Sequence, residues 1–88
     1  MMSAKAELRA KLLSGQAFVF KNAIANGSEE HVSKDDYGWF RYHLFYPSSD
    51  GVGPEMFMNF EPHELDELLA RLESTGALAV YESTTKAE

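Results

Sequence analysis

The sequence contains no cysteine, so neither a disulfide framework nor a thiolate metal site is available to stabilise the fold. It also lacks any apolar run close to the ~20 residues that span a bilayer. The first residues include Lys5 and Glu7, at positions where a secretory signal needs its apolar stretch. These absences predict a cytoplasmic protein that is stabilised by packing alone and makes no contact with a membrane.

Basic residues are scarce in most of the chain. Up to Asn22 there are four basic residues and one acidic residue, whereas the remainder has four basic and thirteen acidic residues. The net charge of −6 disfavours unspecific binding to nucleic acid or to an anionic membrane, because both attract basic surfaces. It favours a partner with a basic surface, although an acidic protein also keeps cations simply to offset its own repulsion.

The chain has the length of one small domain, which we assign to residues 1–88. A chain of this size buries roughly 60–70% of the surface that it exposes when unfolded, which is enough for a single two-layer core. There is no internal repeat and no linker, and residues 83–88 have the composition of a frayed tail.

Two segments have the periodicity of amphipathic helices. The first covers residues 4–14, with Ser3 as its N-cap and Gly15 as its C-terminal cap. The second begins at Pro62, whose missing N–H costs nothing at the first helical position, and ends at Gly76. Its apolar stripe consists of Leu65, Leu68, Leu69 and Leu72.

Residues 17–20, 39–46 and 56–60 have the composition and alternation of strands. Asn26-Gly27 is the pair best suited to a type I′ hairpin turn, and residues 28–32 are either the return strand or a polar loop. Residues 48–54 have the composition of a loop, and residues 78–81 are a candidate for a short final strand.

Short connections between strands imply antiparallel pairing, since a parallel crossover needs a dozen or more residues. We therefore predict an α+β fold, in which an antiparallel meander of three or four strands carries the N-terminal and the C-terminal helix on one face.

Motifs for catalysis or cofactor binding are missing from the sequence. It has no Gly-x-Ser-x-Gly elbow, no phosphate loop and no dinucleotide fingerprint. The three histidines, His31, His43 and His63, do not lie at helical spacing from one another, and no thiol can complete a tetrahedral site. We predict no enzymatic activity, no metal site and no cofactor.

Acidic residues form two groups, one around the second helix and one in the middle of the chain. We predict that they bind a partner protein with a basic surface, as an inhibitor or regulator similar in size and charge to immunity proteins and to phage anti-defence proteins. The ordinary alternative is a solvated helix face with acids at the positive end of the helix dipole. The candidate residues are Glu61, Glu64, Asp66 and Glu67 in the first group, and Glu29, Glu30, Asp35 and Asp36 in the second.

The clearest strand offers a second hypothesis. Trp39, Arg41, His43 and Phe45 share one face of it, and aromatics interleaved with a cation can stack unpaired bases. A strand, a Pro/Gly loop, a strand ending in Asn59-Phe60-Glu61-Pro62 and a leucine-striped helix resemble the C-terminal half of single-stranded-DNA-binding domains of the PC4 type. This resemblance implies binding of single-stranded nucleic acid, but such domains carry basic strands and loops where this chain is acidic.

The aromatic content raises the question of oligomerisation. Two short helices cannot cover so many aromatic side chains, so a homodimer through the uncovered face of the sheet is a further candidate.

Overall fold

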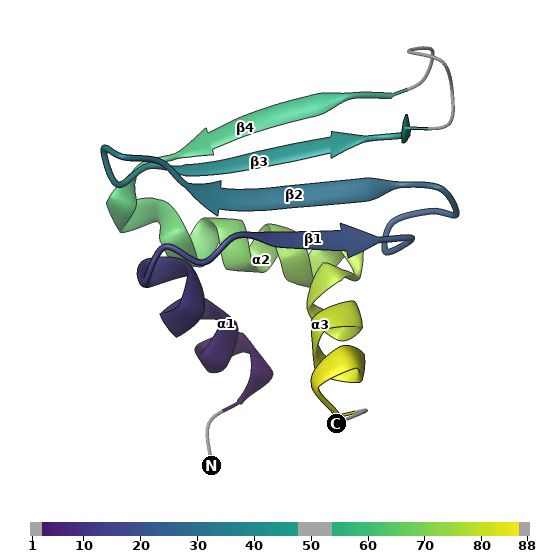
Figure 1. Ribbon diagram of the computed structural model, residues 1–88, viewed down its shortest axis with the longest axis horizontal. Coiled ribbons are helices and arrows are strands. Elements are labelled where there is room, and N and C mark those ends of the chain that lie inside the picture. Colours follow the sequence, from purple (N-terminus) through teal and green to yellow (C-terminus); the bar gives the residue numbers. More distant parts are fainter. Residues whose placement is uncertain (1–2, 48–53, 87–88) are drawn as a thin grey trace.

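The computed structural model describes residues 3–47 and 54–86. The predicted α+β meander is confirmed: a four-stranded antiparallel sheet in the order β1-β2-β3-β4 has α2 across one face, with α1 and α3 projecting past its β1 edge (Figure 1). The elements are α1 (Ala4–Leu13), β1 (Phe18–Lys21), β2 (Glu29–Lys34), β3 (Phe40–Phe45), β4 (Met56–Phe60), the 3-10 turn η2 (Pro62–Glu64), α2 (Leu65–Thr75) and α3 (Ala77–Lys86).

The helix ends follow the cap chemistry of the sequence. The Ser3 hydroxyl accepts a hydrogen bond from the Ala6 amide at the start of α1. At η2, the amide of Glu61 donates to the Glu64 carboxylate over 2.8 Å, which closes a capping box in front of α2. Gly76 ends α2 in the left-handed conformation, with φ of 92°.

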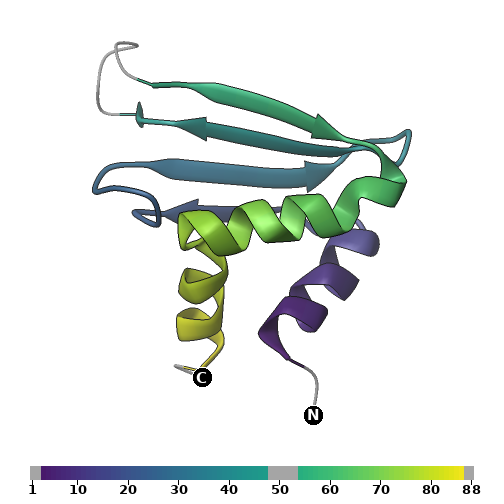
Figure 2. The same cartoon turned by 180° about the vertical axis from the view of Figure 1, so that it is seen from behind.

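The core lies between the sheet and α2. Helix α2 crosses one face of the sheet, while α1 and α3 extend beyond the β1 edge (Figure 2). The alternation of each strand sends one set of side chains to this face, so that most of the predicted leucine stripe packs against aromatic residues. The largest fully buried apolar side chains are Tyr42, Phe40, Leu8, Leu12, Leu65, Leu68, Leu69, Leu72 and Val32.

Three expectations about local structure are wrong. Residues 78–81 belong to α3 and not to a strand, because Ala77 and Tyr81 recur at helical spacing and are both buried. Helix α3 also includes residues 83–86, over which the sequence predicted a tail. The β1–β2 connection spans residues 22–28, with positive φ at Asn22 and Gly27, so Asn26-Gly27 does not form a two-residue hairpin turn.

The alternatives for residues 28–32 resolve in favour of a strand. β2 pairs with β1 on one side and with β3 on the other, and so lies inside the sheet. The predicted loop over residues 48–54 falls mostly outside the described residues. Within the described ranges, no helix combines the length and the apolar character needed to cross a membrane.

Candidate binding surface on the open sheet face

The sheet has a second face, which no helix of the described residues covers, and we call it the open face (Figure 1). Alternation along β2, β3 and β4 directs four ring side chains to this face. In the strand register His31 lies opposite His43, and His43 lies opposite Phe57. Phe45 is two residues from His43 on β3 and completes the group.

Three of these rings stack, and the fourth lies tilted beside them. The rings of His43 and Phe57 are nearly parallel, with centroids 4.0 Å apart and planes 9° apart, and His43 also stacks on Phe45 at 4.5 Å and 18°. Two rings cannot occupy the same side of an imidazole, so His43 is held between Phe45 and Phe57. His31 lies tilted beside Phe45 at 5.0 Å. The four residues, which we call the ring ladder, therefore form one continuous group of ring contacts, in which Phe57 at the end is 68% exposed.

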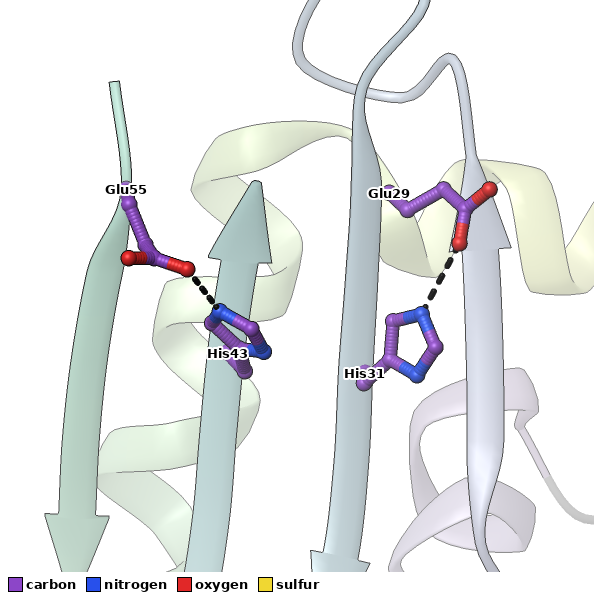
Figure 3. Close-up of polar contacts among 4 residues, drawn as sticks. All are labelled: Glu29, His31, His43 and Glu55. Carbon is purple, nitrogen blue, oxygen red and sulfur yellow. Dashed lines mark hydrogen bonds and ion pairs between the residues drawn. The ribbon is translucent and has the colours of Figure 1, made fainter. Parts of the chain in front are cut away.

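Each histidine of the ring ladder is bound to a glutamate (Figure 3). Nε2 of His31 lies 2.9 Å from a carboxylate oxygen of Glu29, and Nε2 of His43 lies 2.8 Å from one of Glu55. In each pair an N–H at Nε2 can donate to the carboxylate, whose oxygens accept. The pairs orient both rings and place two carboxylates beside them.

A hollow of about 400 Å³ lies beside the ring ladder. Its polar contributors include Arg41, whose side chain is 65% exposed and whose Nε lies 3.3 Å from Asp35. The residues that line the hollow are His31, Ser33, Arg41, Tyr42, His43, Phe57 and Asn59.

Asp35 organises the turn that leads into β3. Its carboxylate accepts hydrogen bonds from the amides of Tyr37 and Trp39 and from Arg41. Partial burial works against ionisation, but these donors outweigh it and hold the pKa of the Asp35 carboxyl below its usual value. This carboxylate is therefore engaged within its own loop.

The structure brings part of the predicted nucleic-acid set together. Arg41, His43 and Phe45 lie on the open face, while Trp39 directly precedes β3 and is 38% exposed. Sequence reasoning missed His31 and Phe57 as members of this surface. Phe57 was detectable, because the alternation of residues 56–60 separates it from the methionines.

The predicted acidic group of the middle chain does not form one exposed surface. Glu30 is fully buried, and its Oε2 accepts hydrogen bonds from the hydroxyls of Tyr42 and Thr75 at 2.7 and 2.8 Å. It cannot reach a partner, because its strand position directs it into the core. Glu29 is bound to His31, and Asp36 is exposed.

The predicted acidic group of the second helix is partly neutralised by α1. Arg9 lies 2.9 Å from Asp66, and Lys5 lies 3.8 Å from Glu73. The basic first helix and the acidic second helix, far apart in the sequence, thus face each other across the surface of the fold. Of the remaining acids, Glu64 caps η2, Glu61 lies 3.4 Å from His63, and Glu67 is exposed.

One group of three side chains within the described ranges has the spacing to hold a metal ion, namely Glu61, His63 and Glu64. The Glu64 carboxylate already accepts the Glu61 amide, and exposed acidic groups of this kind are common without an ion. The group therefore gives no argument for metal binding.

No family model, curated protein or solved structure matches this chain.

Proposed function

We propose that this chain is a protein-binding module whose contact surface is the open face of the sheet. The observation that carries the proposal is the exposure of apolar side chains on a face that no helix covers: Phe57 is 68% exposed and Val19 is 49% exposed. Aromatic residues and arginine are enriched in protein interfaces, and the open face combines both with a ready-made hollow.

The ring ladder favours a protein over a nucleic acid. Bases stack on exposed ring faces, but both faces of His43 are already covered by neighbouring rings. Glu29 and Glu55 hold negative charge beside the histidines, where phosphates would be repelled.

The acidic character of the chain supports a basic partner. A net charge of −6 attracts a basic protein over a distance and speeds its encounter, whereas the open face supplies the desolvated contact. These two roles, long-range attraction by the net charge and contact through the open face, agree with a regulator or inhibitor that competes with an anion for the basic surface of its partner. It does not depend on Glu30, and it uses the carboxylates of α2 only through their long-range field.

The test is affinity capture from native lysate with variants that separate the two surfaces. Val19→Lys alters the open face, and Tyr37→Lys makes the same charge change at a residue that is 86% exposed and lies in the β2–β3 turn. We expect a specific partner to be retained by wild type and by Tyr37→Lys and to be lost with Val19→Lys. Retention by Val19→Lys, combined with loss upon joint charge reversal of Glu64, Asp66 and Glu67, would move the site to α2 and refute the open-face proposal.

Single-stranded nucleic acid is a second candidate, supported by the hollow in which Arg41 and Asn59 lie next to the rings. If it is correct, a labelled oligonucleotide at low salt will alter the fluorescence of Trp39, and Arg41→Ala will weaken binding and reduce its salt dependence. An unchanged fluorescence at high micromolar oligonucleotide would exclude it.

A further inference from the structure

Strand β4 combines an apolar composition with an exposed position. Four of its five residues are apolar, but among these five only Phe60 is buried. Phe57 is 68% exposed on the open face, and Met56, on the opposite face, is 40% exposed. Side chains of this kind are normally covered, so the exposure on both faces indicates that something packs along this strand.

β4 is also an edge of the sheet, and within the described residues no further strand pairs with it. Natural edge strands are blunted by charged residues, prolines or bulges, or are covered by other elements. β4 has no charged residue and no proline, and its pairing with β3 runs from Met56 to Phe60 without a bulge. The opposite edge strand, β1, ends in Lys21 and packs against α3 through Phe18 and Tyr81.

The backbone of β4 has a defined set of groups that face outward. The Asp35 amide donates to the Trp39 carbonyl over 2.8 Å, which makes residues 35 and 39 a hydrogen-bonded pair. Hydrogen-bonded and non-hydrogen-bonded pairs alternate along antiparallel strands. This alternation, followed along the register from the pair of residues 35 and 39, places Phe57 and Asn59 in non-hydrogen-bonded pairs with β3. The N–H and C=O groups of Phe57 and Asn59 therefore point away from β3.

We propose that β4 pairs antiparallel with β4 of a second copy of this chain, across a two-fold axis at Phe57, so that two sheets join into one of eight strands. In this register Phe57 lies opposite the partner's Phe57, Met56 opposite the partner's Met58, and Glu55 opposite the partner's Asn59. The outward N–H and C=O groups of Phe57 then pair with those of the partner's Phe57, and those of Asn59 pair with those of the partner's Glu55, so that the contact is the same for both copies.

Charge and aromatic pairing favour this register over those with the axis at Met58 or at Asn59. A two-fold axis at Met58 would place Glu55 opposite the partner's Glu61, and like charges directly opposite are destabilising. An axis at Asn59 would place Phe57 opposite the partner's Glu61 and lose the aromatic pair. With the axis at Phe57, no acid faces an acid, although each copy carries a net charge of −6.

The pairing also extends the ring ladder. One face of Phe57 stacks on His43, and its other side is where a neighbouring strand would lie. The partner's Phe57 fills that position, so the rings of both copies form one continuous row across the joined open faces. The dimer thereby covers the outer side of Phe57 and leaves the rest of the open face, including Val19 on β1, accessible to another protein.

Sedimentation equilibrium of the purified chain tests the proposal. We expect a dimer mass for wild type, a halved mass for Phe57→Lys with an unchanged circular dichroism spectrum, and a dimer mass for the charge-matched control Tyr37→Lys. A monomer mass for wild type up to millimolar concentration would overturn the proposal, as would a dimer that persists in Phe57→Lys.

The register has its own test, because the natural chain contains no cysteine. Glu55→Cys and Asn59→Cys leave Phe57 intact, and each is oxidised alone and after mixing. We expect disulfide-linked dimers mainly in the mixture, since residue 55 faces the partner's residue 59 and neither residue faces its own copy. Equal cross-linking in the mixture and in the separate samples would contradict the register. Equal cross-linking by Val19→Cys, on the far strand, would contradict the edge contact.

Discussion

Glu30 shows at the scale of one residue how a polar sequence can belong to a core. Its carboxylate joins three elements, because it sits on β2 and accepts from Tyr42 on β3 and from Thr75 at the end of α2. Its second oxygen, Oε1, has no hydrogen-bond partner among the described residues. A buried acid of this kind holds the end of α2 over the sheet, and its removal would take away the acceptor that the buried hydroxyls of Tyr42 and Thr75 share.

The partner of Glu30 in the sheet, Tyr42, has a strongly perturbed phenol. Burial, followed by the hydrogen bond that the phenol donates to Glu30, raises the pKa of Tyr42 from 10 to about 12. The folded state therefore stabilises the protonated phenol. This contribution is complete below pH 10 and is lost as the pH rises from 10 to about 12.

The first prediction follows from the loss of this stabilisation at high pH. Tyr42→Phe removes the hydrogen bond to Glu30, and should lower the free energy of unfolding by about 1–2 kcal/mol near neutral pH. The difference between wild type and variant should shrink between pH 10 and pH 12, because wild type alone loses the phenol's contribution there. Urea denaturation at pH 8, 10 and 11.5 measures it, with the exposed Tyr37→Phe as control. A difference that stays constant over this range would contradict the assignment.

At the scale of elements, the junction between α2 and α3 depends on one glycine. Gly76 adopts a φ of 92°, which L side chains rarely adopt, and a Cβ built there would lie 3.1 Å from the carbonyl oxygen of Ala23. The left-handed residue ends α2 and lets α3 begin at once at Ala77. The tight approach to Ala23 fixes α3 against the chain that follows β1.

The second prediction compares two glycines with similar backbone angles. Gly15 has a φ of 98°, and nothing lies within 4 Å of its added Cβ. Gly15→Ala should cost about 1 kcal/mol of stability for the left-handed conformation alone. Gly76→Ala should cost more, by about 1–2 kcal/mol, because the Cβ also meets a backbone carbonyl that cannot rotate away. Thermal unfolding of both variants checks the order, and equal losses would show that the contact with Ala23 relaxes freely.

The elements also show what the sequence could predict. The caps at Ser3 and Pro62 and the leucine stripes located α1 and α2 because local chemistry alone determines them. β2 was ambiguous because Glu30 and His31 are poor strand formers, and only the fold supplies hydroxyl partners for the buried acid. Helix α3 was missed because Leu78 to Tyr81 favours a strand locally, whereas burial of Ala77 and Tyr81 on one helical stripe outweighs that preference.

For the whole molecule, charges that are separated along the sequence lie close together in the fold. The sequence separates a basic first segment from an acidic remainder, whereas the structure sets Arg9 against Asp66 and Lys5 against Glu73. No pattern along the chain encodes this pairing, since it depends on how α1 docks beside α2. The ring ladder could not be predicted from the sequence either, because it depends on the strand register that puts His31, His43 and Phe57 side by side.

The third prediction tests whether these cross-helix pairs stabilise the fold. Arg9→Glu and Asp66→Arg each place like charges together and should each lower the free energy of unfolding, by up to about 1 kcal/mol at low ionic strength. The double variant Arg9→Glu/Asp66→Arg reverses the pair, restores the attraction and keeps the net charge of −6, so its stability should return close to that of wild type. Urea denaturation of all four proteins at about 10 mM and about 500 mM NaCl measures the coupling, which should fall at high salt because screening shortens the range of exposed charges. A double variant whose loss of stability equals the sum of the two single losses would show that the Arg9–Asp66 contact contributes nothing to holding α1 against the domain.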